Sequence, residues 1–460
     1  MAGMTPGTPR VLRAMNDRAA LDLLLSEGPL SRGRIGKLTG LSKPTASQLL
    51  ARLEAAGLVV VTGRSEGRPG PNAQLYAVNP HAAYVAGVDV TTSRILAGVA
   101  DITGRVTGTF ELPTPPHGQR RRRGQGDEQH RQSAAECVVR AVEGAAKAAG
   151  VHRSELHRLV IGTPGAFDPS TGRLRYASHL PGWHSPTLLE ELAAALPIPL
   201  DYDNDVNLVA VAEQQSGAAK GREDFVLLWN EQGIGAALVI AGRLHRGRTG
   251  GAGEVGFLPV PGTPLVRDPG HVNSGGFQAL AGAGAVLRWA HELGLPYDPD
   301  ACLHEKAAGL VSRAVVAAEG ERAPSADGPA DGNEHGTGNA PATGTGVRAG
   351  AGAWSDRRPG SRPGPNSELL HRFASGTAVG LAAMVSVLDP QLIVLSGGVL
   401  TAGGEPLREL IQAELDELTV PRPPLLLGTV TEHPVLHGAL QSALITTRDE
   451  VFDTTAARAP

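Results

Sequence analysis

The polar side chains between Ser42 and Arg52 have the types and spacing that suit recognition of DNA bases. Ser42 is placed to cap a helix in which Pro44 occupies the tolerant first turn. Apolar residues fall on one face of this helix, and the opposite face is polar and free of carboxylates. Hydroxyl, amide and guanidinium groups can hydrogen-bond base edges in a DNA groove. The candidate DNA-contacting residues are Ser42, Lys43, Thr45, Ser47, Gln48 and Arg52.

The residues before Ser42 predict two further helices that hold this recognition helix in place. Asn16 is expected to cap a first helix that Gly28 ends. Ser31 is expected to cap a second, short helix that ends near Thr39, and Gly40 makes the tight turn. The pattern therefore predicts a helix-turn-helix.

A β-hairpin is expected after the recognition helix. Residues 58–61 and 73–78 have the composition of strands, and a loop rich in Gly and Pro separates them at 63–72. Arg64 and Arg68 lie on that loop and are expected to enter a minor groove or to contact phosphates. A helix-turn-helix followed by such a hairpin is a winged helix.

Charge is distributed unevenly along the chain. Residues 1–80 contain ten Lys or Arg and five Asp or Glu, a net of +5, whereas the whole chain carries −4, which leaves −9 for the other 380 residues. Positive charge is therefore concentrated where a polyanion would bind. We expect a DNA-binding domain at residues 1–80, and a winged helix that binds a protein is the alternative.

The length of the chain requires a larger architecture after the winged helix. At about 150 residues per domain, 460 residues suggest roughly three domains. Hydrophobic residues make up 41% of the chain and aromatic residues 3%, so Ala, Val and Leu must build the cores. Two Cys, no apolar run of about 20 residues and no signal-peptide core predict a cytoplasmic protein without a membrane span.

The body of the chain repeats a pattern of three strands. Strands are expected at 84–89, 95–101 and 105–111, and again at 225–230, 234–240 and from Leu244. Helical or mixed segments follow each set, so the expected fold class is α/β. We expect two related lobes, at 81–203 and 204–460, with a ligand cleft between them and a C-terminal helix able to pack back on the first lobe.

Two insertions interrupt these lobes. Residues 113–133 include four consecutive Arg and predict a mobile basic loop, with contact to phosphates as the alternative to a solvated run of charge. Residues 319–367 have low complexity and little to bury, so they are expected to be disordered.

Six short motifs follow one another along the body. They are Gly162-Thr163-Pro164-Gly165, Leu180-Pro181-Gly182-Trp183, Asn204-Asp205-Val206-Asn207 with Glu213, Gly233-Ile234-Gly235, Ala252-Gly253-Glu254-Val255-Gly256 and Ser396-Gly397-Gly398. In this order they resemble the ROK family of repressors and sugar kinases, over nearly the whole chain apart from the two insertions. The wing motif Gly67-Arg68-Pro69-Gly70 is similar to that of the family's repressor branch.

The resemblance implies a winged helix joined to a two-lobed body of the actin-like, sugar-kinase type. Kinases of the family transfer a phosphoryl group from ATP to a sugar hydroxyl, and Asp205 is the equivalent of their general base. By the same resemblance, Asn204, Asp205 and Glu254 hold hydroxyl groups of an effector. His179 stands where the family has an Asn and keeps a hydrogen-bonding side chain there.

Departures from the family pattern favour a regulator over a kinase. Thr91 replaces the Gly of the first phosphate loop and places a Cβ where backbone must approach phosphate. Phe257 replaces a His that binds sugar and zinc, and the Cys cluster of the zinc site is missing from residues 270–281. We therefore expect no zinc, no cofactor and no catalytic residue in use. A purely structural alternative also stands, because Asn204 and Asp205 are common at helix starts.

These patterns predict a transcriptional repressor that binds a double-stranded DNA operator and senses a sugar or sugar derivative. A homodimer or homotetramer is expected, because symmetric operators reward paired winged helices. One alternative is an ATP-dependent sugar kinase fused to a DNA-binding domain. Another is a regulator that responds only to a protein partner.

Overall fold

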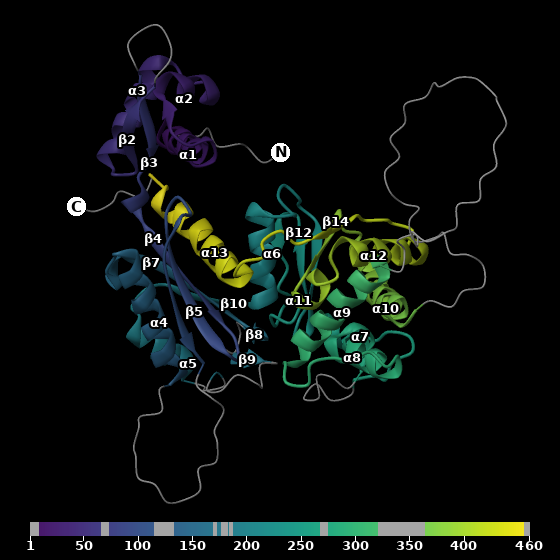
Figure 1. Ribbon diagram of the computed structural model, residues 1–460. Helices are drawn as coiled ribbons and strands as arrows, with labels where there is room; N and C mark the ends of the chain where they lie inside the picture. Colours follow the sequence, from purple (N-terminus) through teal and green to yellow (C-terminus); the bar gives the residue numbers. More distant parts are fainter. Residues whose placement is uncertain are drawn as a thin grey trace, which may run out of the picture. The chain divides into compact units, whose positions relative to one another are not determined.

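The computed structural model describes residues 9–65, 73–114, 133–168, 173–175, 183, 187–266, 275–320 and 364–454 (Figure 1). The chain divides into two compact units. The first contains residues 1–221, 244–252 and 429–460, and the second contains residues 222–243 and 253–428. The division expected after residue 203 falls instead after residue 221, because α6 (Asp205–Ser216) packs against α13 (Pro434–Val451) within the first unit.

The N-terminal part of the first unit is a winged helix. Its elements are α1 (Pro9–Glu27), β1 (Leu30–Ser31), α2 (Arg32–Thr39), α3 (Lys43–Ala55), β2 (Val59–Arg64) and β3 (Gln74–Val78). The three strands form an antiparallel sheet in the order β1-β3-β2. The predicted helix-turn-helix and wing hairpin are confirmed, with the tip of the wing outside the described residues.

Local chemistry sets the boundaries of these helices. The Ser31 and Ser42 hydroxyls each accept a hydrogen bond from the backbone N–H three residues later, at 3.4 and 3.3 Å. Gly40 ends α2 in the left-handed conformation, with φ of 72°. The prediction that Asn16 caps the first helix is wrong, because α1 begins at Pro9 and Asn16 lies inside it. Proline is tolerated in a first helical turn, so the helix can start there.

A five-stranded sheet forms the centre of the first unit. Its order is β10 (Leu200–Asn204), β7 (Leu156–Thr163), β4 (Tyr84–Val90), β5 (Arg94–Asp101) and β6 (Val106–Pro113). The β4-β5-β6 strands pair antiparallel, whereas β7 pairs parallel with both β4 and β10. Helices α4 (Ala134–Ala149) and α5 (Leu188–Ala195) pack into one core with this sheet.

The second unit repeats the same strand order. Its sheet runs β13 (Arg243–Leu244), β12 (Ile234–Ile240), β11 (Phe225–Asn230), β14 (Leu392–Ser396) and β15 (Leu425–Leu427). Again β11 and β12 pair antiparallel, whereas β14 pairs parallel with both β11 and β15. Two sheets with one topology account for the repeated strand pattern in the sequence and confirm the α/β class.

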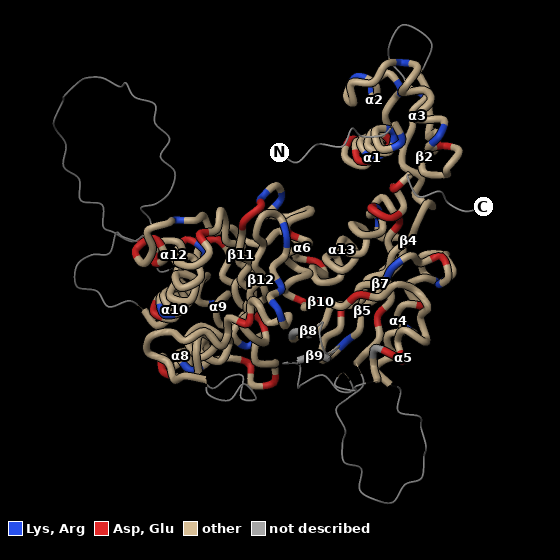
Figure 2. Tube along the Cα trace, turned by 180° about the vertical axis from the view of Figure 1, so that it is seen from behind, with Lys and Arg blue, Asp and Glu red and all other residues tan. Residues whose placement is uncertain are grey.

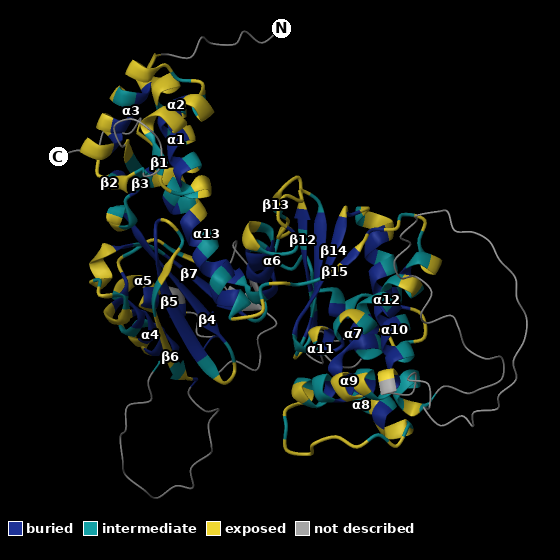
Figure 3. Ribbon diagram, turned by 45° about the horizontal axis from the view of Figure 1, so that its top comes forward, coloured by how far each residue is buried: buried dark blue, intermediate teal, exposed yellow. Residues whose placement is uncertain are grey.

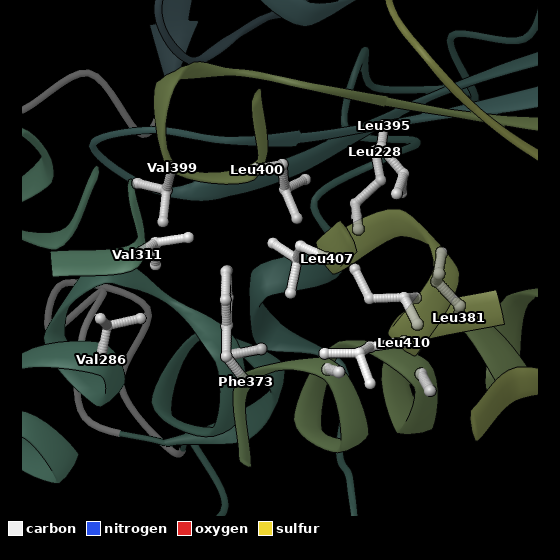
Figure 4. Packing of buried hydrophobic residues seen from close by; sticks show 14 of the residues in the cluster. Leu228, Val286, Val311, Phe373, Leu381, Leu395, Val399, Leu400, Leu407 and Leu410 are labelled. Carbon is white, nitrogen blue, oxygen red and sulfur yellow. The ribbon is translucent and has the colours of Figure 1, made fainter. Parts of the chain in front are cut away.

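Helices build the large core of the second unit. They are α7 (Gly276–Ala281), α8 (Ala283–Glu292), α9 (Leu303–Gly320), α10 (Pro365–Leu388), α11 (Gly398–Thr401) and α12 (Gly404–Leu418). Phe373 of α10 lies among aliphatic side chains from neighbouring elements, including Val311 and Leu407 (Figure 4). The central strands are buried along almost their full length (Figure 3). Within the described residues, no helix is long and apolar enough to cross a membrane.

Most of the two predicted insertions, residues 115–132 and 321–363, lies outside the described residues. The parts of residues 113–133 and 319–367 that are described belong to the ends of β6, α4, α9 and α10.

The C-terminal helix α13 contacts the sheet, α6 and the winged helix in turn (Figure 1). Gly438 lets α13 approach α6 closely, since a Cβ there would overlap the Leu208 carbonyl. At the other end, Phe452 is 1% exposed and lies in the winged-helix core with Leu21 and Ile102. Arg448 Nε also donates a hydrogen bond to the Ile102 carbonyl at 2.9 Å.

Polar contacts strengthen the same junction. Arg18 of α1 forms an ion pair with Asp449 at 2.7 Å, and its guanidinium carbon lies 5.8 Å from the centre of the Phe452 ring. The Thr454 hydroxyl donates to the buried Asp17 carboxylate at 3.2 Å. The winged helix is therefore completed by residues from the other end of the chain.

We predict that Phe452→Ala destabilises the winged helix by about 3–5 kcal/mol, the usual cost of truncating a buried Phe. Hydrogen exchange of backbone amides in α1 and α3 would measure the loss. Ile445→Ala is the matched control on the same helix, because Ile445 is 41% exposed and its truncation should cost less than about 0.5 kcal/mol. Equal protection in the two variants would contradict the packing role of Phe452.

Candidate functional site

The outer face of α3 presents several polar side chains to solvent. Lys43, Thr45 and Gln48 are exposed, whereas the opposite face of the helix is buried in the core of the winged helix. Three of the predicted DNA-contacting hydroxyls, those of Ser42, Thr45 and Ser47, already have local partners. The Ser42 hydroxyl lies 2.8 Å from the Thr45 hydroxyl and caps the helix, and the Ser47 hydroxyl donates to the Lys43 carbonyl at 2.9 Å.

Arg52 differs from the other predicted DNA-contacting residues because it has a buried partner. Its Nη2 atom donates to Asp17 Oδ1 at 2.6 Å, and Asp17 is 3% exposed. A buried carboxylate that loses its cation costs several kcal/mol. Arg52 therefore joins α3 to α1, and contact with DNA is at most a second role for its exposed part.

Basic side chains extend beyond the predicted set. Arg32, Arg34 and Lys37 of α2 are exposed, as is Arg64 at the end of β2. Figure 2 shows basic positions in blue along the winged helix. Arg68 lies outside the described residues. The first helix of a helix-turn-helix crosses the phosphate backbone, so cations on α2 are suitably placed. The surplus of positive charge in residues 1–80 was the sequence signal for them.

Asp203 organises the second predicted site, at the end of β10. Its carboxylate is 6% exposed and accepts four hydrogen bonds. They come from the Asn204 backbone at 2.9 Å, Asn207 Nδ2 at 2.9 Å, and Arg246 Nε and Nη2 at 3.1 and 2.5 Å. We did not predict this role for Asp203, although it directly precedes the Asn204-Asp205 pair.

Asn204 caps a helix and also lines a cavity. Its Oδ1 accepts hydrogen bonds from the backbone N–H groups of Val206 and Asn207, at 2.9 and 3.2 Å, so it caps α6. Its Nδ2 donates to the Gly165 carbonyl at 3.0 Å and fixes the Gly162–Gly165 motif. Asn204 and Arg246 also line a cavity of about 510 Å³ beside β10, which is within the usual size range for small-molecule sites.

Asp205 follows as the first residue of α6. Its Oδ1 accepts a hydrogen bond from the Val206 backbone at 2.8 Å, and the residue is partly exposed. Capping is therefore carried chiefly by Asn204. A carboxylate at a helix N-terminus is stabilised as an anion, which suits it to accept a hydroxyl proton or a hydroxyl hydrogen bond.

Glu254 in the second unit is a carboxylate without hydrogen-bond partners in the described part of the chain. It follows Gly253, whose φ of 98° is in the left-handed region and whose Cβ position would overlap the Ala236 carbonyl. Burial raises the pKa of Glu254 above its ordinary value of 4.5. The residue is partly buried, and a partly desolvated carboxylate without a partner costs stability.

Glu213 provides the structural contrast. It is 0% exposed, and its two oxygens accept hydrogen bonds from the backbone N–H groups of Ala218 and Val430 at 2.7 and 2.9 Å. These bonds tie α6 to the segment that leads into α13. Glu213 is therefore a structural carboxylate, in contrast to Glu254.

The first expected phosphate loop, between β4 and β5, is closed on itself. Thr91 N–H donates to the Arg94 carbonyl at 2.9 Å, and the Thr91 hydroxyl accepts from the backbone N–H groups of Ser93 and Arg94 at 3.3 and 3.1 Å. Arg94 also pairs with the buried Asp89 at 3.2 Å. The backbone donors that a phosphate needs are thus already used.

The Gly233-Ile234-Gly235 turn, whose backbone would approach ATP phosphates by the ROK resemblance, has the same limitation at Ile234. Ile234 N–H donates to Gln278 Oε1 at 2.6 Å, and Gln278 is 5% exposed. Gln278 is among the residues by which this sequence departs from the family pattern. The Gln278 side chain accepts the hydrogen bond that the Ile234 N–H would otherwise give to a phosphate oxygen. We did not predict this role from the sequence.

Comparison with known proteins agrees with this architecture. The ROK family matches residues 117–291, and the MarR family matches residues 2–68. A solved ROK family transcriptional regulator, a homolog of the E. coli MLC protein, aligns over 96% of this chain and 97% of its own, with a TM-score of 0.62 and 16% identity. The chain therefore carries a ROK domain behind a MarR-like winged helix.

Curated relatives of this chain include both regulators and kinases. A putative xylose repressor of Caldicellulosiruptor sp. is 25% identical over 254 residues, 55% of this chain and 61% of the repressor. The glucokinase of Streptomyces coelicolor is 26% identical over 206 residues, 45% of this chain and 58% of the kinase. The chain thus spans about three fifths of the length of these relatives.

The zinc site implied by the ROK resemblance does not fit this chain. Phe257 lies where a His ligand is expected and offers no lone pair. Gln278 is committed to the Ile234 backbone. His179, the remaining predicted effector residue, lies outside the described residues.

We predict that Glu254→Gln stabilises the ligand-free protein at neutral pH. A carboxyl whose pKa is raised by folding binds its proton more tightly in the folded state, so stability falls as pH rises from about 4.5 through the folded pKa. The amide has no charge to desolvate, so a gain of about 0.5–2 kcal/mol is expected at pH 7, and none below pH 4. Denaturant unfolding across that pH range would measure it.

Glu213→Gln is the control for this substitution. It turns an acceptor of two backbone N–H groups into a group with its own donors, so it should destabilise by about 1–3 kcal/mol. If Glu254→Gln destabilised the protein as much as Glu213→Gln, the claim that Glu254 lacks a structural partner would be refuted.

Proposed function

We propose that this ROK protein is a DNA-binding transcriptional regulator, a repressor, whose body senses a sugar or sugar derivative. The observation that carries the proposal is the exposed polar face of α3, supported by cations on α2 and β2, in a chain that also has the ROK body. Its similarity to a putative xylose repressor supports the same function. Binding to chromosomal DNA requires that the protein act in the cytoplasm.

The DNA contacts divide by chemistry. We propose that Gln48 and Thr45 read base edges in the major groove, because amide and hydroxyl groups distinguish base pairs there. Lys43, Arg64 and Arg68, together with the α2 cations, bind phosphates. A single winged helix offers few contacts, so a homodimer or homotetramer on a two-fold symmetric operator is part of the proposal.

The effector contacts come from the other predicted set. We propose that Asn204 and Asp205 in the first unit, and His179 and Glu254 elsewhere in the chain, bind hydroxyl groups of the effector. The cavity beside β10 and the unpartnered carboxylate of Glu254 support this assignment. For an effector to change DNA binding, the protein must have two conformations that differ in affinity for DNA, and the effector must bind one of them more tightly than the other.

We predict that Gln48→Ala relaxes sequence preference at one base pair, costing roughly 1–3 kcal/mol there. Arg64→Ala should instead weaken binding to all sequences. It should also make the slope of log affinity against log salt concentration shallower by about 0.9, the value for one lost phosphate contact. Operator sequences selected by the full chain from a random DNA library would supply the probe. Glu54→Gln, an exposed α3 control, should leave sequence preference unchanged. Loss of preference in all three variants alike would argue against base reading by Gln48.

We predict that Asp205→Ala leaves operator affinity nearly intact and weakens the response to effector ten-fold or more. A carboxylate that accepts a hydroxyl hydrogen bond contributes roughly 1–3 kcal/mol to binding. A thermal-shift screen of sugars and sugar phosphates, beginning with xylose and glucose, would identify the effector, since ligand at 100 times its Kd adds about 2.7 kcal/mol.

Asn204→Ala is the structural comparison for Asp205→Ala. It removes the helix cap and should lower the melting temperature, by about 0.5–2 kcal/mol of stability. Asp205→Ala should lose effector affinity with less loss of stability. If Asp205→Ala only lowered the melting temperature and induction were unchanged, the effector assignment would fail.

A sugar kinase fused to a DNA-binding domain is the second candidate, favoured by the similarity to a glucokinase. The closed turn at Thr91 and the Gln278–Ile234 hydrogen bond argue against it, because they occupy the donors that ATP phosphates would use. ADP release with a panel of sugars distinguishes the two. Turnover of about 1 per second or more would support the kinase. An absence of any sugar effect on melting would favour a regulator that responds to a protein partner.

A further inference from the structure

Three metal-ligating side chains gather at the start of α9 in the second unit. Cys302 precedes the helix, and His304 and Glu305 lie in its first turn. The Cys302 sulfur lies 3.2 Å from His304 Nδ1. A thiol sulfur, an imidazole nitrogen and a carboxylate oxygen from these residues all lie within 4.8 Å of one another. Such spacing lets three atoms share one cation at bonds of about 2.0–2.3 Å.

A fourth side chain is placed to orient the imidazole. Glu231, at the turn between β11 and β12, has Oε1 3.8 Å from His304 Nε2. His304 Nδ1 therefore faces the sulfur while Nε2 has a carboxylate nearby, although Nε2 also lies 3.6 Å from the sulfur. A metal-binding His usually gives its other ring N–H to a carboxylate, which fixes the tautomer and the ring orientation.

Helix capping explains only one member of this cluster. Glu305 Oε2 accepts a hydrogen bond from the Cys302 backbone N–H at 3.0 Å, as in the return bond of a capping box. That bond uses neither the thiol nor the imidazole, and the thiol makes a separate side-chain hydrogen bond to the Glu305 carboxylate. A helix cap requires no thiol and no imidazole, so the cap does not explain why all three metal-ligating groups gather here.

We propose that Cys302, His304 and Glu305 bind a divalent cation of the Zn²⁺ class, with Glu231 as the orienting partner of His304. Thiolate and imidazole favour Zn²⁺ over Mg²⁺ or Ca²⁺, which prefer oxygen ligands. One thiolate and one carboxylate neutralise the two positive charges, and the thiol proton passes to solvent. Water completes the four ligands, because Cys302 is exposed.

This site is separate from the residues that the ROK resemblance assigns to zinc. Those positions are at Phe257 and within 270–281, whereas the new ligands begin α9. None of the four residues belongs to the proposed DNA-contacting or effector sets. Through the contact between His304 and Glu231, a bound cation would hold the start of α9 to the turn between β11 and β12.

Cobalt titration of the chelator-treated full chain tests the proposal, because thiolate bound to Co²⁺ gives a charge-transfer band. The chain has two Cys, so the band must come from Cys302 or from the buried Cys137. We expect one Co²⁺ per chain, displaced by Zn²⁺ and unaffected by excess Mg²⁺. Cys302→Ser should abolish the band, and the matched variant Cys137→Ala should keep it.

Two further variants test the remaining ligands. His304→Gln should abolish stoichiometric binding, and Glu231→Gln should weaken Zn²⁺ affinity about 10–100-fold while the band persists. Far-UV circular dichroism of each metal-free variant controls for folding, since Cys302 and His304 lie at a helix start rather than in a core. Binding that survives in Cys302→Ser or His304→Gln, or a wild-type chain that binds less than one Co²⁺ at micromolar concentrations, would overturn the proposal.

Discussion

The close packing of α13 is the constraint on which the first unit depends. Gly438 brings α13 against the Leu208 carbonyl of α6, the helix that begins at the Asn204-Asp205 pair. At its other end, the same helix places Phe452 in the core of the winged helix. A rigid helix of 18 residues thus contacts the element with the proposed effector groups and the element with the proposed DNA groups. A displacement of α6 relative to the sheet cannot leave the base of the winged helix unaffected, because close-packed interiors do not deform freely.

Buried carboxylates distinguish structural positions from binding positions in this protein. Asp17, Asp203 and Glu213 are each less than a tenth exposed, and each has cations or N–H donors that compensate its burial. Glu254 has no such compensation in the described part of the chain, and its pKa is raised in consequence. Burial of an unpaired carboxylate is unfavourable, which supports the proposal that Glu254 meets a ligand from outside.

Local patterns in the sequence predicted the winged helix and the two sheets well. Helix caps at Ser31 and Ser42 and the turn at Gly40 act over three or four residues, so their signals are visible in the sequence itself. The start of α1 was missed because Asn16 is a favourable cap that the helix does not need. Partners distant in sequence were not predictable in this way. The Arg52–Asp17 ion pair spans 35 residues, and the Gln278–Ile234 hydrogen bond spans 44. Such contacts depend on the tertiary fold, which is why neither the Arg52–Asp17 ion pair nor the role of Gln278 was foreseen.

The groups that would bind nucleotide and the groups that would bind sugar, as the ROK resemblance assigns them, are in different states in this chain. On the nucleotide side, the backbone donors near Thr91 and at Ile234 are consumed by internal hydrogen bonds. A phosphate would have to break those bonds before it formed its own, which removes most of the gain from binding. On the sugar side, the Asp205 carboxylate is partly exposed at a helix start, and the Glu254 carboxylate has no internal partner. A body whose donors near the phosphate loops are already used, and in which Glu254 keeps a carboxylate without an internal partner, fits the proposed sensor better than a kinase.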